Sequence, residues 1–300
     1  MELQWPLILF TTLLAWSAGL FATQCAYALR GAAPKAQMPA WITSAVLLVV
    51  GGIAVFMHLE HWERIFNGFG HITSGITQEL IAIVVLAVVA VVFVAYLRRE
   101  GGKVPVWVCV AGIVVSVILL VVMAHSYMMA ARPAWDSVFQ ILSIVGAACA
   151  MGSGTMAAID GFTRDAEAAG DEAAATDPAA KLNGLAVLGG SLVNAVTTLL
   201  YIAVMSVASS SFVSMGHYFD PTHPTQAVAD GALLTPFGGG LPMTLLAIIA
   251  ALVAVVCALV GKKQGAWKVW GLAAAVCGCV SAIALRVLFY QMGGSVFLYF

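Results

Sequence analysis

The chain has 300 residues, of which 62% are hydrophobic and 9% charged, and its mean hydropathy is +1.00. A soluble globular domain carries roughly a quarter of charged residues, so this composition excludes that class and indicates an integral membrane protein. The 13 basic and 14 acidic residues nearly balance and form no basic patch, which excludes a nucleic-acid-binding protein.

Eight apolar runs reach the length of roughly 20 residues that a helix needs to cross a bilayer. They cover residues 6–29, 41–59, 77–97, 105–128, 138–159, 183–208, 241–260 and 267–292. Glycine and proline punctuate the connections between the runs, as is typical of helix ends. The sequence therefore predicts an all-α integral membrane protein, a bundle of eight transmembrane helices in one domain, 1–300. The first run lacks a basic start and a small-residue cleavage site, so we expect it to be retained as a span.

The basic residues predict the orientation of this bundle. Ten of the 13 lysines and arginines lie in connections that would share one face, whereas Arg64, Arg132 and Arg286 fall toward the other. The positive-inside rule places the ten in the cytoplasm, and eight spans then put both termini outside.

Two connections are long. The acidic, alanine-rich segment 160–181 is typical of a solvated linker. Segment 209–240, with no Lys or Arg, is long enough to indicate partner docking on the outer face.

Ionisable side chains gather toward the outer ends of four predicted spans. At about 1.5 Å per residue, His58, His125 and Arg286 lie about 26 to 30 Å from the inner ends of their helices. Glu79 opens the third span on the same side. Each of these side chains alone is compatible with an interfacial anchor. Because ionisable groups near a bilayer are costly and usually mark a site, their common depth favours one functional layer.

Quinol oxidation is a reaction that needs this combination of groups. A quinol loses two protons with its two electrons, so the neutral imidazole of His58 would accept a proton and Glu79 would relay it outward. Arg64 or Arg286 would stabilise the negative charge that develops on the quinol oxygen. The other predicted quinol-binding residues are His125, Tyr127 and Tyr290.

Short motifs at the ends of the predicted spans carry a resemblance to a known family. The motifs are Gln4 to Thr11, Met57-His58-Leu59, Arg64 to Asn67, Gln78-Glu79-Leu80, Tyr127 with Pro133 and Trp135, and Arg286 to Tyr290. Together they resemble the anchor subunit of bacterial dimethyl sulfoxide reductase. His125 departs from the family pattern, which has Arg at this position, and Glu60 departs from a family Gly.

The resemblance implies a subunit of a bacterial plasma membrane that works in anaerobic respiration. Such a subunit contains no haem and anchors a molybdopterin catalytic subunit and an iron–sulfur subunit, to which it passes electrons from menaquinol. It would carry the quinol-oxidising half-reaction and not the terminal reduction. Residues matching His58 and Arg64 belong to the quinol region of that family, and Glu79 matches the carboxylate of the neighbouring helix.

Two other functions remain open at this point. His58 and His125 come from different spans at similar depth and could be the axial ligands of one b-type haem, which a reduced-minus-oxidised optical spectrum would reveal. A transporter or a purely structural anchor is the second alternative, although no pair of broken helices at the membrane midplane is evident. None of the six cysteines forms a Cys-x-x-Cys pair, so we expect no iron–sulfur cluster and no structural zinc in this chain.

Overall fold

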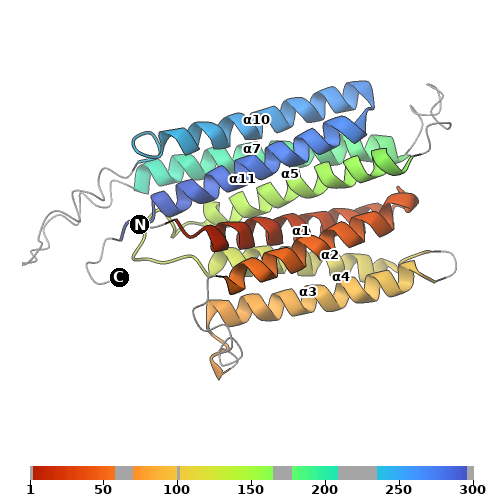
Figure 1. Ribbon diagram of the computed structural model, residues 1–300, viewed down its shortest axis with the longest axis horizontal. Helices are drawn as coiled ribbons and strands as arrows, with labels where there is room; N and C mark the ends of the chain where they lie inside the picture. The colour runs from red at the N-terminus through yellow and green to blue at the C-terminus, as the bar shows by residue number, and fades with distance from the viewer. Residues whose placement is uncertain (1–2, 58–69, 100–101, 165–177, 209–234, 296–300) are drawn as a thin grey trace, which may run out of the picture.

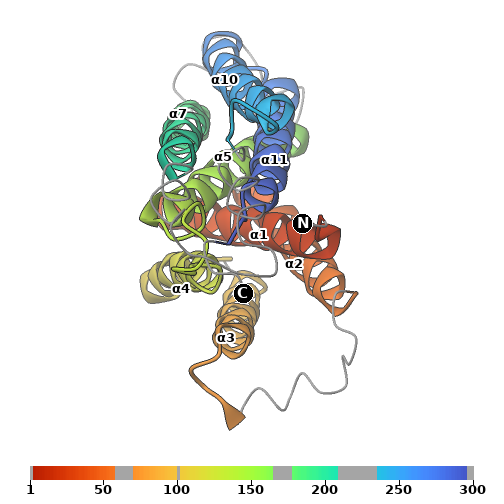
Figure 2. The ribbon, with the colours of Figure 1, turned by 90° about the vertical axis from the view of Figure 1, so that its left-hand side faces the viewer.

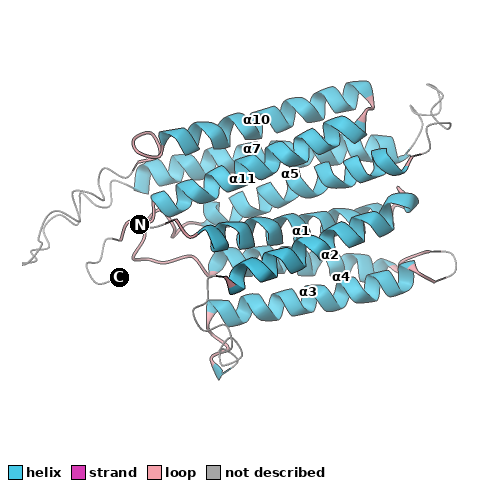
Figure 3. Cartoon of the chain, viewed as in Figure 1, coloured by secondary structure: helices cyan, strands magenta, loops and turns pink. Residues whose placement is uncertain are grey.

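The computed structural model describes residues 3–57, 70–99, 102–164, 178–208 and 235–295, and all regular structure in these ranges is helical (Figure 3). A short 3₁₀ turn, η1, precedes the second of the long helices. The elements are α1 (Trp5–Leu29), η1 (Pro34–Ala36), α2 (Gln37–Phe56), α3 (Gly75–Leu97), α4 (Val106–His125), α5 (Val138–Thr163), α7 (Pro178–Ala208), α10 (Leu241–Gln264) and α11 (Trp267–Gln291). Within the described ranges, eight helices are long and apolar enough to cross a membrane. The predicted all-α, eight-span architecture is therefore confirmed at this level, and the chain is a multi-pass membrane protein.

The eight long helices run side by side, so their ends collect at the two ends of one elongated bundle (Figure 1). Helices α1, α5 and α11 occupy the middle, with α7 and α10 on one side and α2, α3 and α4 on the other (Figure 2). The central helix α5 packs against α1, α7 and α11, whereas α3 packs mainly against α4. Helix α1 begins and α11 ends at the same end of the bundle (Figure 1).

Glycines let the central helices approach closely. A Cβ atom on Gly152 of α5 would collide with the backbone of Gly19 in α1. A Cβ atom on Gly154 would lie 2.9 Å from the carbonyl oxygen of Gly271 in α11. In a bilayer, where the hydrophobic effect does not drive helices together, such small residues allow the close van der Waals contact that holds a bundle.

The peripheral helices turn their apolar side chains outward. Val46, Val49 and Ile53 of α2 are more than half exposed, as are Val88 and Val91 of α3. Exposed rows of branched aliphatic side chains would be unfavourable in water, but they match a hydrocarbon solvent. The outer surfaces of α2 and α3 therefore face lipid.

The two ends of the bundle differ in charge. We call one end the basic end, because it carries the ten lysines and arginines expected to share a face: Arg30, Lys35, Arg98, Arg99, Lys103, Arg164, Lys181, Lys262, Lys263 and Lys268. We call the opposite end, where α3 begins and where α4 and α11 end near Tyr127 and Tyr290, the tyrosine end. The clustering of the basic residues is as expected, while the side of the membrane that each end faces stays a prediction.

Several helices extend beyond the predicted spans. Helix α7 begins at Pro178 instead of Asn183, and α10 continues past Val260 to Gln264. Hydropathy identifies only the apolar part of a helix, and both extensions carry lysines, Lys181 in α7 and Lys262 and Lys263 in α10. Lysines in the last turn of α10 interact favourably with the helix dipole, and the chain leaves the helix at Gly265, whose φ is 70°.

Candidate functional site

Glu79 is buried in the first turns of α3 at the tyrosine end, with only 7% of its surface exposed. Ser126, directly after α4, donates a hydrogen bond from its hydroxyl to Glu79 Oε1. Gly75 lies one turn before Glu79, and a Cβ atom there would be 2.7 Å from the Ser126 Cβ. The missing side chain at Gly75 therefore gives Ser126 the room it needs to reach the carboxyl group.

Tyr127 follows Ser126 and lies between Glu79 and α11. The guanidinium carbon of Arg286 lies 5.5 Å from the centre of the Tyr127 ring, and Phe289 packs edge-on against the same ring. Burial raises the pKa of the Tyr127 phenol well above its ordinary value, and the nearby Glu79 carboxyl raises it further. Arg286 opposes this shift only in part, so Tyr127 stays protonated at physiological pH and can donate a hydrogen bond.

The turn that carries Tyr127 is fixed to the end of α11. The Trp135 indole donates a hydrogen bond of 2.7 Å to the carbonyl oxygen of Phe289, and its ring stacks on the Phe289 ring with the centres 4.3 Å apart. Arg132 covers the other side of this contact, with its guanidinium carbon 4.4 Å from the Trp135 ring centre. Arg132 also donates a hydrogen bond of 2.9 Å to the carbonyl oxygen of Gly293. These contacts hold Tyr127 in place.

A cavity of about 290 Å³ lies beside this carboxyl and phenol. Its size is near the lower end of the range for small-molecule sites, ~300–1,000 Å³. Apolar side chains of α1, α2 and α3 form most of its wall, and Glu79, Ser126 and Tyr127 supply polar groups on one side. Two further lining residues, Ile76 and Met129, are exposed on the outside of the protein. The cavity therefore reaches the surface at the level of the first turns of α3.

Arg286 and Tyr290 lie behind Tyr127 and are not among the lining residues of the cavity. Arg286 is 7% exposed, and one terminal nitrogen of its guanidinium has no hydrogen-bond partner within the described residues. The Tyr290 hydroxyl, by contrast, interacts with the hydroxyl of Tyr127. Arg286, which the sequence predicts to stabilise charge on a bound quinol, contacts the Tyr127 ring and does not line the cavity.

A small internal cavity of about 20 Å³ adjoins Arg286. This volume is enough for one water molecule, which needs at least about 10–15 Å³ measured this way. Thr12 lines the cavity as well, and its hydroxyl oxygen has no partner among the described residues. A water molecule there would hydrate the buried guanidinium.

The structure brings together four predicted site residues from three different spans or their ends, Glu79, Tyr127, Arg286 and Tyr290. It does not bring His125 to them, because this last residue of α4 is exposed and does not line the cavity. The remaining two candidates, His58 and Arg64, lie outside the described residues, so their roles stay predictions.

Sequence reasoning missed Ser126 and the polar groups around Arg286. Serine and threonine give a weak hydropathy signal, and in a helix their hydroxyls commonly bond to a carbonyl one turn back, as Thr11 does with Leu7 at 2.8 Å. Gln140 gives a clearer hydropathy signal than a serine or a threonine does. It is fully buried in α5, and neither polar atom of its side chain has a partner among the described residues.

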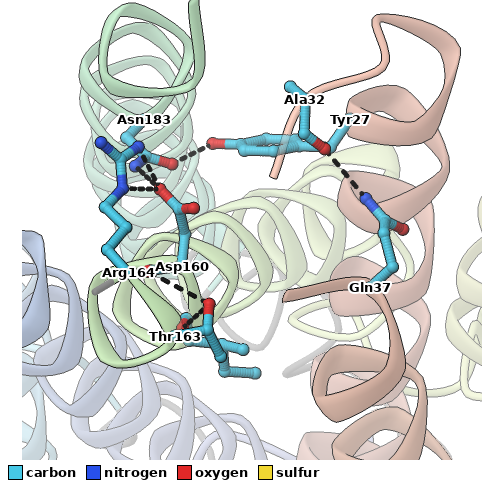
Figure 4. A network of polar contacts seen from close by, with 8 residues as sticks. Tyr27, Ala32, Gln37, Asp160, Thr163, Arg164 and Asn183 are labelled. Carbon is cyan, nitrogen blue, oxygen red and sulfur yellow. Dashed lines mark hydrogen bonds and ion pairs between the residues drawn. The ribbon is translucent and has the colours of Figure 1, made fainter. Parts of the chain in front are cut away.

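A second buried polar cluster lies at the basic end (Figure 4). Asp160 accepts hydrogen bonds from Asn183 at 2.7 Å and from Arg164 Nε at 2.9 Å. The Tyr27 hydroxyl donates to the Asn183 side-chain oxygen at 2.7 Å. These bonds pair a buried carboxylate with a cation and join α1, α5 and α7, which is the pattern of a structural network. Arg286 has no carboxylate partner of this kind among the described residues.

Comparisons of the sequence with models of known protein families and with curated proteins find no match. The fold defines the class, a multi-pass all-α membrane protein.

Proposed function

We propose that this chain is the membrane anchor subunit of a molybdopterin and iron–sulfur oxidoreductase similar to bacterial dimethyl sulfoxide reductase. It binds menaquinol in the cavity at the tyrosine end and oxidises it there. The electrons pass to an iron–sulfur subunit docked at the same end, and from it to the molybdopterin subunit. The terminal acceptor is reduced on that partner, in a bacterial plasma membrane during anaerobic respiration.

One observation carries the proposal: a buried carboxyl group and a protonated phenol share an apolar cavity that reaches the outside of the protein beside lipid-facing helices. A quinol is dissolved in the membrane and has an apolar ring with two hydroxyl groups. Its ring suits the wall formed by α1, α2 and α3, and its hydroxyls suit Glu79 and Tyr127. A transporter for a water-soluble substrate would not need access from lipid.

The chemistry assigns separate roles to the polar groups. Oxidation of the quinol to the quinone releases two protons and two electrons. The Glu79 carboxylate receives a proton, and Ser126 holds its orientation through the hydrogen bond to Oε1. Tyr127 donates a hydrogen bond to the second quinol oxygen and stabilises the charge that develops there. His58, three residues beyond the lining residue Val55, remains the proposed first proton acceptor.

The basic end is proposed to face the cytoplasm, so the tyrosine end faces outward. Protons from the quinol then leave on the outer side, where the partner also consumes protons in the terminal reduction. Turnover is electroneutral in this scheme. Release of the quinol protons into the cytoplasm would contradict it.

The test is the substitution Glu79→Gln, which keeps the shape of the side chain and its contact with Ser126. The glutamine side chain cannot accept a proton as the Glu79 carboxylate does. We expect menaquinol oxidation by membranes containing the assembled complex to fall by about 10²-fold, the size of a general-base contribution. Binding of a short-chain naphthoquinone to the purified chain, followed by tryptophan fluorescence, should change less than about threefold.

The matched control is Gln78→Ala, since Gln78 neighbours Glu79 in the chain but is exposed and does not line the cavity. This variant should oxidise menaquinol at the rate of the unaltered complex. Full quinol oxidation by the Glu79→Gln variant would refute the role of Glu79. Loss of the partner subunits from the membrane would instead show a failure of assembly. The binding assay on the purified chain separates that failure from a loss of quinone binding.

A further inference from the structure

A second cavity, of about 610 Å³, lies at the basic end, away from the proposed quinol site. It lies between the turn that joins α1 to α2 and the turn that joins α3 to α4. Its wall is largely apolar, with Ala28, Met38, Leu97 and Val104 among the lining residues. Lys103 also lines it, and nothing in the proposed function uses this cavity.

The two turns are strongly basic. Segments 30–37 and 98–104 contain five basic residues, Arg30, Lys35, Arg98, Arg99 and Lys103, and one acidic residue, Glu100. All five basic side chains are exposed at the end of the bundle. Arg99 lies over the Tyr96 ring at 4.6 Å, and this contact limits the positions that its guanidinium can adopt. The cavity thus combines an apolar interior with a cationic edge.

The wall on the side of α1 and α2 is fixed by buried hydrogen bonds. Gln37 is 4% exposed, and its side-chain nitrogen donates to the Ala32 carbonyl oxygen at 3.2 Å (Figure 4). The Gln24 side-chain nitrogen donates to the Gln37 carbonyl oxygen at 2.6 Å, and the Ala32 backbone amide donates to the Tyr27 carbonyl oxygen at 3.0 Å. The turn passes through Gly31 at a φ of 62°, where a Cβ atom would meet nothing within 4 Å. A ligand entering here would meet a preformed surface.

We propose that this cavity binds the head group of an anionic phospholipid of the phosphatidylglycerol type. The phosphate pairs with Lys103 and Arg30 at the edge, and the first carbons of the acyl chains lie against the apolar wall. Basic pockets between transmembrane helices at the membrane surface are suited to such head groups. A soluble anion would gain nothing from the apolar wall, whereas a lipid uses both parts of the cavity.

The bound lipid would link two helix pairs that touch little. Helix α2 packs against α1, and α3 packs against α4, but α2 and α3 share only a small contact. The head group would bridge the turns at the base of both pairs. In this way an anionic lipid at the basic end would stabilise the pairs whose opposite ends enclose the quinol cavity. This last consequence rests on the proposed function, but lipid binding does not.

The experiment measures lipid retained by the purified full-length chain in detergent, by native mass spectrometry. Phosphatidylglycerol and phosphatidylcholine with the same acyl chains are added in equal amounts. We expect phosphatidylglycerol to bind at least fivefold more tightly. Lys103→Gln should reduce that preference about fivefold, as expected for the loss of one basic contact at a membrane surface.

The control variant is Lys263→Gln, which removes one exposed charge from the same end of the bundle, at the end of α10. It should leave the preference for phosphatidylglycerol unchanged. Equal binding of the two lipids to the unaltered chain would overturn the proposal without any variant. An equal loss in both variants would show a diffuse charge effect, and displacement of the lipid by millimolar inorganic phosphate would assign the site to a free anion. Either result would also overturn it.

Discussion

Glu79 and Arg286 are two buried ionisable residues at the tyrosine end, close enough to interact electrostatically. Within the described part of the chain, no ion pair joins them, and Tyr127 lies between the two groups. Leaving a buried charge without a partner costs several kcal/mol. By contrast, Asp160 at the basic end is paired with Arg164 and Asn183. Glu79 and Arg286 have no such ion pair among the described residues, so they are better candidates for function than the ion-paired Asp160.

The proposed role of the neutral Tyr127 phenol can be tested by substitution. Its raised pKa keeps it protonated through the physiological range, so Tyr127→Phe should lower quinol oxidation without changing the shape of its pH profile. The expected loss is roughly fivefold, which corresponds to about 1 kcal/mol for one hydrogen bond. The measurement is the rate of menaquinol oxidation by membranes between pH 5.5 and 8.5.

Tyr96→Phe is the control for this change, because Tyr96 lies at the other end of α3 and packs against Trp107. It should leave the rate unaltered. A displaced pH profile in the Tyr127→Phe variant would mean that the phenol titrates in this range, and equal losses in both variants would mean that the effect is not local.

The residue scale also shows what the sequence could and could not predict about the site. Counting residues along apolar helices predicted the common depth of Glu79, Arg286 and Tyr290. It could not predict that Tyr127 separates Arg286 from the cavity. The position of that ring depends on the path of the turn after α4, which the stacking of Trp135 on Phe289 determines. Such a contact between distant segments has no signal in hydropathy.

At the scale of the elements, contacts of small residues set the spacing of α1, α5 and α11. The backbones of Gly19 and Gly152 lie so close that neither position has space for a side chain. The run of small residues in α5 was visible in the sequence, but its partner helix was not. Hydropathy predicts that a helix spans the membrane, and it says little about which neighbour the helix packs against.

The substitution Gly152→Ala should therefore destabilise the bundle. Its Cβ atom would collide with the backbone of Gly19, which cannot move aside as a flexible side chain could. We expect the free energy of unfolding to fall by about 1–3 kcal/mol, typical of overpacking. The measurement is unfolding of the purified chain by a denaturing detergent, followed by circular dichroism.

Gly52→Ala in α2 provides the comparison, since a Cβ atom at Gly52 meets nothing within 4 Å. It should unfold like the unaltered chain or be slightly more stable, because alanine restricts the unfolded chain. If Gly152→Ala were as stable as Gly52→Ala, the close crossing of α1 and α5 would be wrong.

At the scale of the whole molecule, the bundle separates two kinds of polar site. The basic end has a paired internal network and a cationic cavity suited to an anionic lipid. The tyrosine end has a buried carboxyl group and a buried guanidinium, which no ion pair joins among the described residues, beside a cavity that reaches the lipid-facing surface. The number of spans and the segregation of basic residues followed from the positions of apolar and basic residues in the sequence. The two cavities did not, because they depend on how far the α1–α2 pair and the α3–α4 pair stand apart, which hydropathy does not indicate.

The central claim is that a quinol binds in the cavity enclosed by α1, α2 and α3 at the tyrosine end. The most direct measurement is photolabelling of the chain, in membranes, with an azido-naphthoquinone, followed by peptide mass spectrometry. The account predicts labels on cavity residues such as Phe10, Val55 and Ile83, and their loss when unlabelled menaquinone is added in excess. Labels confined to α10, or to the exposed side of α4 around His125, and unaffected by menaquinone, would contradict it.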